Sequence, residues 1–111
     1  MVDERAERIA RNEARFREIN ERVERDLVGM VAAPGELLPF VCECGLRDCT
    51  RTLELTIREY EHVRDDPTWF ATLPGHEIED VERVIERHER FVVVRKDERT
   101  HDIVKESDPR R

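Results

Sequence analysis

Hydrophobic side chains recur at helical spacing over the first thirty residues of the chain. An apolar residue falls at every seventh position, and Ala6, Ile19 and Leu27 widen the stripe formed by Val2, Ile9, Phe16, Val23 and Met30. Asp3 is placed to cap the start of a helix and Gly29 to end it. Glutamate precedes arginine by four positions at Glu4–Arg8, Glu7–Arg11, Glu13–Arg17, Glu18–Arg22 and Glu21–Arg25. The pattern predicts one long amphipathic helix.

The apolar stripe of this helix is narrow, and Asn12 and Asp26 interrupt it. A narrow seam suits packing on one partner better than burial in a large core. Two interpretations follow: the helix lies across its own domain, or it docks on a second copy or another protein.

From residue 31 the pattern changes to turns and alternating positions. Pro34-Gly35 marks a turn, and Leu38, Phe40, Cys42 and Cys44 then alternate as in a strand. The alternation resumes after Cys49, which predicts a hairpin with the thiols at its tip. Downstream, Thr56-x-x-Glu59 is a capping box that opens a short helix, "IREYEHVRDD", ended by Pro67.

The rest of the chain mixes strand and helix signals. The segment "TWFATL" predicts a strand, and "FVVV" predicts another. Residues 78–90 fit either a helix or a strand, and the tail predicts a short helix that ends at Pro109. The fold class expected is α+β: an N-terminal amphipathic helix over 1–30, followed over 31–111 by a small antiparallel sheet with one short helix and a zinc-stapled hairpin.

Composition narrows this picture. Of the 111 residues 38% are hydrophobic and 42% are charged, so the core is small and benefits from a staple such as a metal ion. The sequence shows neither a membrane-spanning run nor a signal peptide, which predicts a cytoplasmic protein. The net charge of −7 disfavours nucleic acid as a partner.

All three cysteines lie within eight positions, in a Cys-x-Cys-x4-Cys pattern. Cys42 and Cys44 are two apart on a predicted strand, so both side chains leave the same face, and a turn through Gly45 brings Cys49 beside them. Zinc prefers four thiolate and imidazole ligands in a tetrahedron. For the fourth ligand we favour His76, which a Pro-Gly turn presents, over the other histidines, His62, His88 and His101.

Four protein ligands leave no open position on zinc, so the predicted site is structural and the protein a non-enzymatic interaction or regulatory module. The sequence has no phosphate-binding loop, catalytic triad or His-Glu-x-x-His motif, and the acidic clusters with Asp65, Asp66 and Glu77 are interpreted as solvated surface. Alternatives are three inert thiols, a redox or zinc-release sensor in which Arg47 and Arg51 lower the thiol pKa, and a nucleic-acid-associated factor.

Most of the chain resembles a family of small uncharacterised proteins from high-GC Gram-positive bacteria. The resemblance is carried by "RNEARFREINERVE", "FVCECGLRDCT", "LELTIREYEHVRDDPTWF", "LPGHEIEDVERVIERHERFVVV" and "SDPRR". It implies that Cys42, Cys44, Cys49 and His76 belong to one pattern. It also implies a β-hairpin that pairs residues 81–87 with 91–96. It brings no activity. The narrow seam of the N-terminal helix makes a protein partner, or self-association through that helix, the expected interaction.

Overall fold

The computed structural model describes residues 3–30, 33, 35–46 and 48–110. One long helix is followed by a two-stranded and a three-stranded antiparallel sheet with short helices between and after them, which confirms the α+β class. The elements are α1 Glu4–Gly29, β1 Leu38–Val41, β2 Thr52–Leu55, α2 Ile57–Val63, β3 Trp69–Thr72, β4 Glu82–Arg87, β5 Val92–Lys96, the 3-10 turn η1 Glu98–Thr100 and α3 His101–Glu106.

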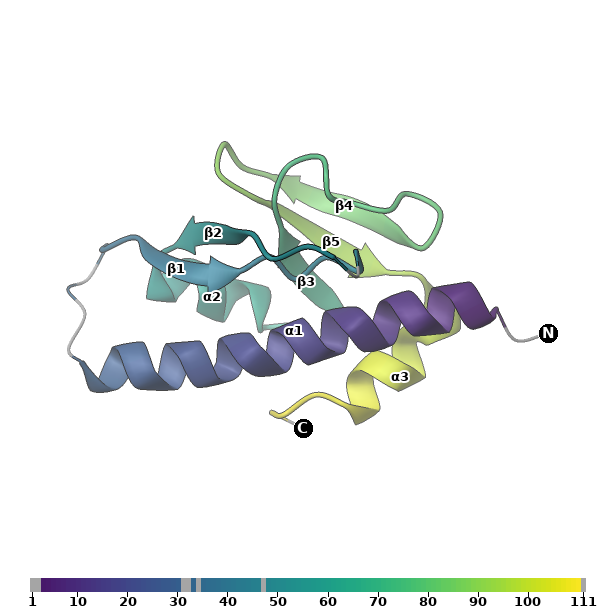
Figure 1. Ribbon diagram of the computed structural model, residues 1–111, viewed down its shortest axis with the longest axis horizontal. Helices are drawn as coiled ribbons and strands as arrows, with labels where there is room; N and C mark the ends of the chain where they lie inside the picture. Colours follow the sequence, from purple (N-terminus) through teal and green to yellow (C-terminus); the bar gives the residue numbers. More distant parts are fainter. Residues whose placement is uncertain (1–2, 31–32, 34, 47, 111) are drawn as a thin grey trace.

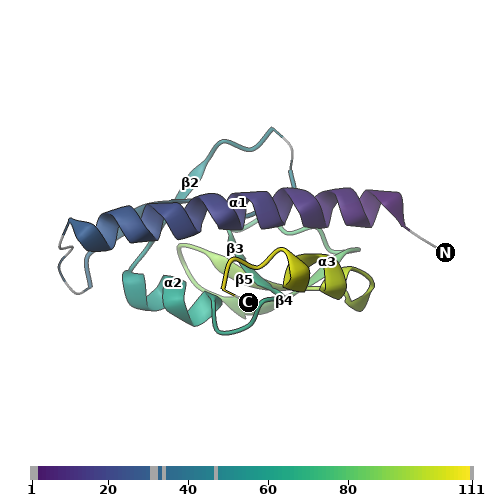
Figure 2. The ribbon, with the colours of Figure 1, turned by 90° about the horizontal axis from the view of Figure 1, so that it is seen from below.

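Helix α1 lies across its own domain along the full length of the molecule (Figure 1). Its 26 residues correspond to about 39 Å at about 1.5 Å per residue, most of the 47 Å long axis. Asp3 caps the helix as predicted, because its carboxylate accepts a hydrogen bond from the Ala6 N–H. Figure 2 shows α2 and α3 on one side of α1 and the loop after β1 on the other.

The buried face of α1 differs from the predicted heptad stripe. Ile9 is buried and Phe16 and Val23 are half-buried, but Ile19 and Met30 are 38% and 76% exposed. Val2, also assigned to that stripe, lies outside the described residues. The helix instead buries a row of small and polar side chains at three- and four-residue spacing: Ala6, Ala10, Glu13, Ala14, Arg17, Asn20 and Glu21.

The predicted hairpin before α2 forms as β1 paired with β2, from Leu38 opposite Leu55 to Val41 opposite Thr52. Helix α2 begins with the predicted capping box, in which Thr56 and Glu59 exchange side-chain-to-backbone hydrogen bonds. Gly35 has φ 80, as its predicted turn requires; Pro34 lies outside the described residues.

The ambiguous segment 78–90 contains a strand, β4 Glu82–Arg87, and no helix. Strand β4 pairs with β5 in the order β3-β5-β4, and a register irregularity falls between Val84 and Glu86. Because of this irregularity the hydrophobic residues of the segment do not alternate strictly. Their spacing therefore resembles that of a helix although the segment pairs as a strand. The hairpin implied by the resemblance is therefore confirmed. In the tail, α3 confirms the predicted short helix.

Two apolar layers cover the two faces of the three-stranded sheet. On one face Ala71 and Val93 pack with the β1–β2 hairpin and α2, where Phe40 stacks on Tyr60 at 4.6 Å between ring centroids. On the other face Val92 and Val94 pack with Ala10 of α1 and Val104 of α3, together with Phe70. Helix α1 also contacts β1 directly, so it packs against the hairpin as well as against this face of the sheet.

Charged side chains from α1 enter this interior and take partners on other elements. Glu13 binds the Lys96 ammonium at 2.5 Å, and Glu82 binds it at 3.2 Å, with all three side chains fully buried. Arg17 donates to the carbonyl oxygens of Pro67 and Val104. Burial and the Glu82 charge raise the pKa of Glu13, which offsets the excess negative charge of the cluster.

These contacts correct the ion pairing expected along α1. Of the five predicted i,i+4 pairs in α1, only Glu7–Arg11 and Glu18–Arg22 are ion pairs among the described residues. Four glutamates are instead buried: Glu13, Glu21, Glu43 and Glu82. The physical reason is that cations and amides from distant segments reach them, which offsets the cost of removing carboxylates from water.

The C-terminal tail closes on α1 through arginine–carboxylate contacts. Arg64 bridges Glu21 of α1 and Asp108 of the tail, and Arg110 binds Glu21 at 2.5 Å and Glu24 at 3.1 Å. Within the described residues no helix is long and apolar enough to cross a membrane.

Glu24, beneath this tail, makes unfolding pH-dependent. Burial and the neighbouring Glu61 raise the pKa of Glu24 from 4.5 to about 8. Because the unfolded chain releases this proton near pH 4.5 and the folded chain near pH 8, the free energy of unfolding falls between those values. The side chain of the Glu24→Gln variant cannot ionise. The free energy of unfolding of this variant, measured by urea titration, should therefore rise relative to that of the parent protein as the pH increases over this range.

The exposed Glu106 on α3 supplies the matched control. The difference in free energy of unfolding between Glu106→Gln and the parent protein should stay constant across that pH range. A difference between Glu24→Gln and the parent protein that does not change with pH would contradict the role assigned to Glu24.

Candidate metal centre

The first two cysteines follow directly after β1. The strand ends at Val41, but the Cys42 N–H still donates to the Arg51 carbonyl, so the antiparallel ladder continues one step further. Cys49 returns after a turn in which its N–H donates to the Leu46 carbonyl. The thiols lie at the tip of the hairpin, as predicted, but Cys42 and Cys44 follow the regular strand instead of lying on it.

His76 reaches the thiols from the connection between β3 and β4. Gly75 has φ 89, a left-handed conformation that glycine adopts readily, and the His76 N–H donates to the Leu73 carbonyl. The same connection contacts the thiols through its backbone, because the Leu73 N–H donates to Cys42 Sγ at 3.2 Å. The Pro-Gly turn thus presents the imidazole as predicted.

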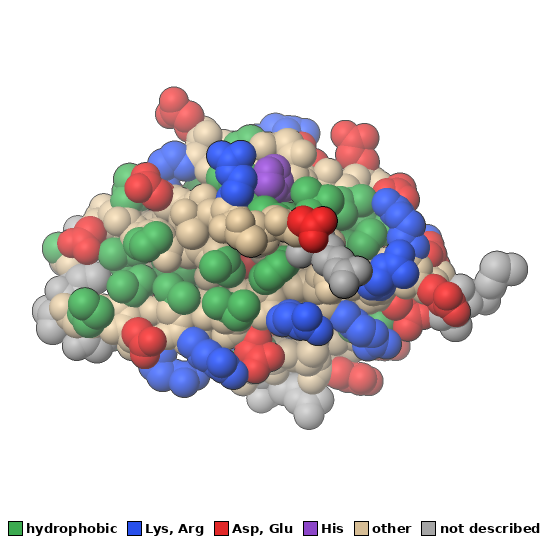
Figure 3. Space-filling view, in the orientation of Figure 1, with side chains coloured by type: hydrophobic (Ala, Val, Ile, Leu, Met, Phe, Trp, Pro, Cys, Tyr) green, Lys and Arg blue, Asp and Glu red, His purple; other side chains and the backbone are tan. Residues whose placement is uncertain are grey.

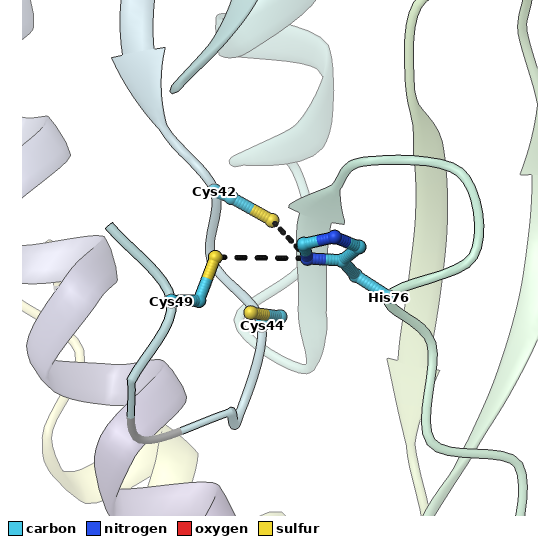
Figure 4. Close-up of side chains that lie close together, drawn as sticks. All are labelled: Cys42, Cys44, Cys49 and His76. Atoms are coloured by element: carbon cyan, nitrogen blue, oxygen red, sulfur yellow. Dashed lines mark hydrogen bonds between the residues drawn. The ribbon is translucent and has the colours of Figure 1, made fainter. Parts of the chain in front are cut away.

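The four predicted ligand residues come together in space. Figure 4 shows Cys42, Cys44, Cys49 and His76 converging from the hairpin tip and the facing loop. His76 Nδ1 lies 3.6 Å from Cys42 Sγ and 3.6 Å from Cys49 Sγ, and all four ligand atoms lie within 4.8 Å of one another. They form the one such group of His, Cys and acidic residues found among the described residues.

These separations fit a tetrahedral metal site. With bonds of about 2.3 Å to sulfur and about 2.0 Å to nitrogen, ligands on one zinc ion lie about 3.5–3.8 Å apart. The two measured sulfur–nitrogen distances of 3.6 Å fall in this range. The remaining separations are bounded at 4.8 Å, so some side chains would have to close by up to about 1 Å to bind one ion.

Two of the thiols are held in their protonated form when no cation is bound. A hydrogen bond with Cys42, together with burial, holds the pKa of the Cys44 thiol far above its usual value, and burial raises that of Cys49. The backbone amides of Leu46 and Arg51 act in the opposite direction on these two thiols. A bound metal ion would displace these protons and convert the thiols to thiolates.

This result corrects the expectation that neighbouring arginines lower the thiol pKa. The Arg51 side chain is exposed, and only its backbone amide contributes. Arg47, the second arginine of that prediction, lies outside the described residues.

The remaining histidines have other contacts. His62 and His88 both bind the Glu86 carboxylate, at 2.7 and 2.9 Å, and His101 Nε2 contacts the Lys96 carbonyl at 2.8 Å. The preference for His76 over these three is consistent with their positions.

Gly45 is needed at this site for a reason that the sequence did not show. Its φ is not in the left-handed region, which contradicts the predicted reason for a glycine at this turn. A Cβ atom at Gly45 would lie 2.2 Å from Ile9 Cγ2, so glycine allows α1 to approach the thiol loop closely. Asn12 adds a hydrogen bond of 3.4 Å to the Gly45 carbonyl.

Glu43, between two of the cysteines, is a further residue that the sequence reasoning missed. Its fully buried carboxylate accepts hydrogen bonds from Asn20 at 2.9 Å and from the Ala71 N–H at 3.0 Å, while its own N–H donates to the Ala71 carbonyl. Because it alternates with the cysteines, its side chain points away from the thiols. Glu43 therefore joins the thiol loop to α1 and β3.

No family model, curated protein or solved structure matches the chain. The assignment of the site therefore rests on its own geometry.

The close approach at Gly45 predicts a stability defect. Gly45→Ala should lower the free energy of unfolding by about 1–3 kcal/mol, because the added methyl group overlaps Ile9. Ile9→Ala removes the nearest atom, so Gly45→Ala should cost less in that background, as a double-mutant cycle in urea would measure. Leu46→Ala, at an exposed neighbour, should change stability little. Equal costs of Gly45→Ala in both backgrounds would contradict this contact.

Proposed function

We propose that Cys42, Cys44, Cys49 and His76 bind one zinc ion and that this ion stabilises the fold. The observation that carries the proposal is the convergence of four ligand atoms within 4.8 Å of one another. Three thiolates and one imidazole are a ligand set typical of structural zinc, whereas Mg²⁺ and Ca²⁺ prefer oxygen ligands. The preference for zinc over iron rests on the mixed sulfur and nitrogen donors.

The proposed ion connects segments that are distant in the sequence. Three ligands come from the hairpin and one from the β3–β4 connection, while Gly45 lies against Ile9 of α1. With 42% charged residues and a buried layer that includes ion pairs, the domain depends on more than apolar burial. Zinc binding energy would become folding energy here, as in other small zinc domains.

Zinc with four protein ligands has no free position for a substrate, so we assign the protein no enzymatic role. We propose a cytoplasmic interaction or regulatory module, since three free thiols suit a reducing compartment.

Figure 3 shows hydrophobic side chains gathered over α1 and β1. Large apolar side chains remain exposed at Ile19, Val28, Met30, Leu37 and Leu46. Their exposure supports contact with a protein, and the net charge of −7 disfavours nucleic acid.

The zinc proposal predicts one metal ion per chain and a stability that depends on it. Protein purified under reducing conditions should contain zinc close to one equivalent by elemental analysis. His76→Ala should reduce this content and lower the melting temperature markedly, because the variant loses one of four ligands. A strong chelator should have the same effect on the parent protein.

His62→Ala is the matched control, since His62 is exposed on α2 and contacts Glu86 rather than the thiols. This variant should keep the full zinc content and most of the thermal stability. A His76→Ala variant that has lost its zinc but keeps the melting temperature of the parent protein would refute the proposal that the ion stabilises the fold.

The predicted preference for protein partners is tested with nucleic acids. Fluorescence anisotropy with labelled single-stranded and double-stranded oligonucleotides should show no saturable binding near 0.1 M salt, because the chain has seven more acidic than basic residues. Binding that weakens steeply with added salt would instead favour the nucleic-acid-associated alternative.

A further inference from the structure

The three thiols of the metal centre differ in their exposure to solvent. Cys42 and Cys44 are 2% and 0% exposed, whereas Cys49 is only half-buried. His76 is also half-buried, so the centre is open to solvent where these two residues meet. A small reagent in solution therefore reaches the sulfur of Cys49 before the other two.

A second thiol stands opposite Cys49. The β1–β2 register pairs Leu38 with Leu55 and Val41 with Thr52, and the backbone bond from Cys42 to Arg51 continues it one step beyond the strands. Extended two residues further, the same register would set Cys44 opposite Cys49. Their sulfur atoms already lie within 4.8 Å of each other. Cysteines that face each other across an antiparallel pair are within the range that a disulfide can bridge.

We propose that Cys49 is the site at which hydroperoxides oxidise the centre, that Cys44 then forms a disulfide with it, and that the metal ion is released. This inference rests on the proposed zinc site, because zinc keeps the thiols as thiolates. A thiolate, unlike a thiol, is a nucleophile toward peroxide oxygen. The redox-sensor alternative thus becomes a defined reaction at two named residues.

The reaction balances with one hydroperoxide and two protons. The Cys49 thiolate attacks the terminal peroxide oxygen and takes up its hydroxyl group as Cys49–SOH, while the O–O bond breaks and the leaving oxygen takes a proton from solvent and departs as water or an alcohol. The Cys44 thiolate then attacks the Cys49 sulfur, the S–O bond breaks, and the hydroxide leaves as water with the second proton. Two thiolates are oxidised by two electrons, and the peroxide is reduced.

Release of the ion follows from the loss of two of its four ligands. Cys42 and His76 alone cannot complete a tetrahedron, and a disulfide sulfur is a poor zinc ligand. The β3–β4 connection would then keep only its backbone contact from Leu73 to Cys42. The thiol loop, in contrast, remains against α1 through Gly45 and Asn12. Oxidation therefore separates the histidine loop from a hairpin that stays in place.

The test begins with full-length protein that contains one equivalent of zinc. Hydrogen peroxide at low excess, with a chromogenic chelator present, should release the zinc, and mass mapping should find a Cys44–Cys49 disulfide. With dimedone present from the start, the sulfenic acid adduct should appear on Cys49 first. A thiol reductant and added zinc should restore the starting protein.

A ligand-preserving variant separates reactivity from folding. Cys49→His keeps four ligands in a Cys2His2 set, so it should retain zinc while releasing it several-fold more slowly under peroxide. Where this variant fails to bind zinc, the dimedone experiment on the parent protein still decides the order of oxidation.

The outcomes distinguish this inference from the proposed function. Protein that binds no zinc overturns the proposed function. Protein that binds zinc but keeps it under peroxide, or carries the first adduct on Cys42 or Cys44, overturns the inference alone. Zinc release with the first adduct on Cys49 and a Cys44–Cys49 disulfide supports both.

Discussion

The crowding of three sulfurs and one imidazole into a single group is the constraint on which the hairpin tip and the histidine loop depend. With all four ligand atoms within 4.8 Å, the thiols cannot all ionise unless a cation lies between them. Burial and thiol–thiol hydrogen bonding raise the pKa of Cys44 for the same reason. In the proposed site a metal ion would convert this unfavourable arrangement into a bonded cluster and so hold two segments far apart in the sequence at one point.

The second organising feature is the charged interior beneath α1. Glu13, Arg17 and Glu21 project inwards from the helix and find their partners on β5, on the segment before β3 and in the C-terminal tail. Each buried charge demands a partner, so these contacts specify how α1 lies on the sheet as well as stabilising it. Apolar contacts through Ala6, Ala10 and Ala14 are small by comparison and let the helix approach closely.

The metal centre and the charged interior meet at the loop that carries the cysteines. Gly45 contacts Ile9 on one side of this loop, and Glu43 binds Asn20 and Ala71 on the other. The thiols are thus held by α1 and β3 independently of the imidazole. In the proposed site the hairpin would therefore stay in place on α1 and β3, while the position of the histidine loop would depend on the metal ion.

Local patterns in the sequence determined the parts of the structure that need only local contacts: the Asp3 cap, the Thr56–Glu59 capping box, the β1–β2 hairpin and the Pro-Gly turn before His76. The ligand set was also within reach of the sequence, because thiol and imidazole chemistry admits few fourth ligands. Only the tertiary structure decided that 78–90 contains the strand β4, that α1 buries Glu13 and Arg17, and that Gly45 serves close packing. Each of these depends on partners distant in the chain, such as Lys96, Val104 and Ile9, whose approach no local spacing records.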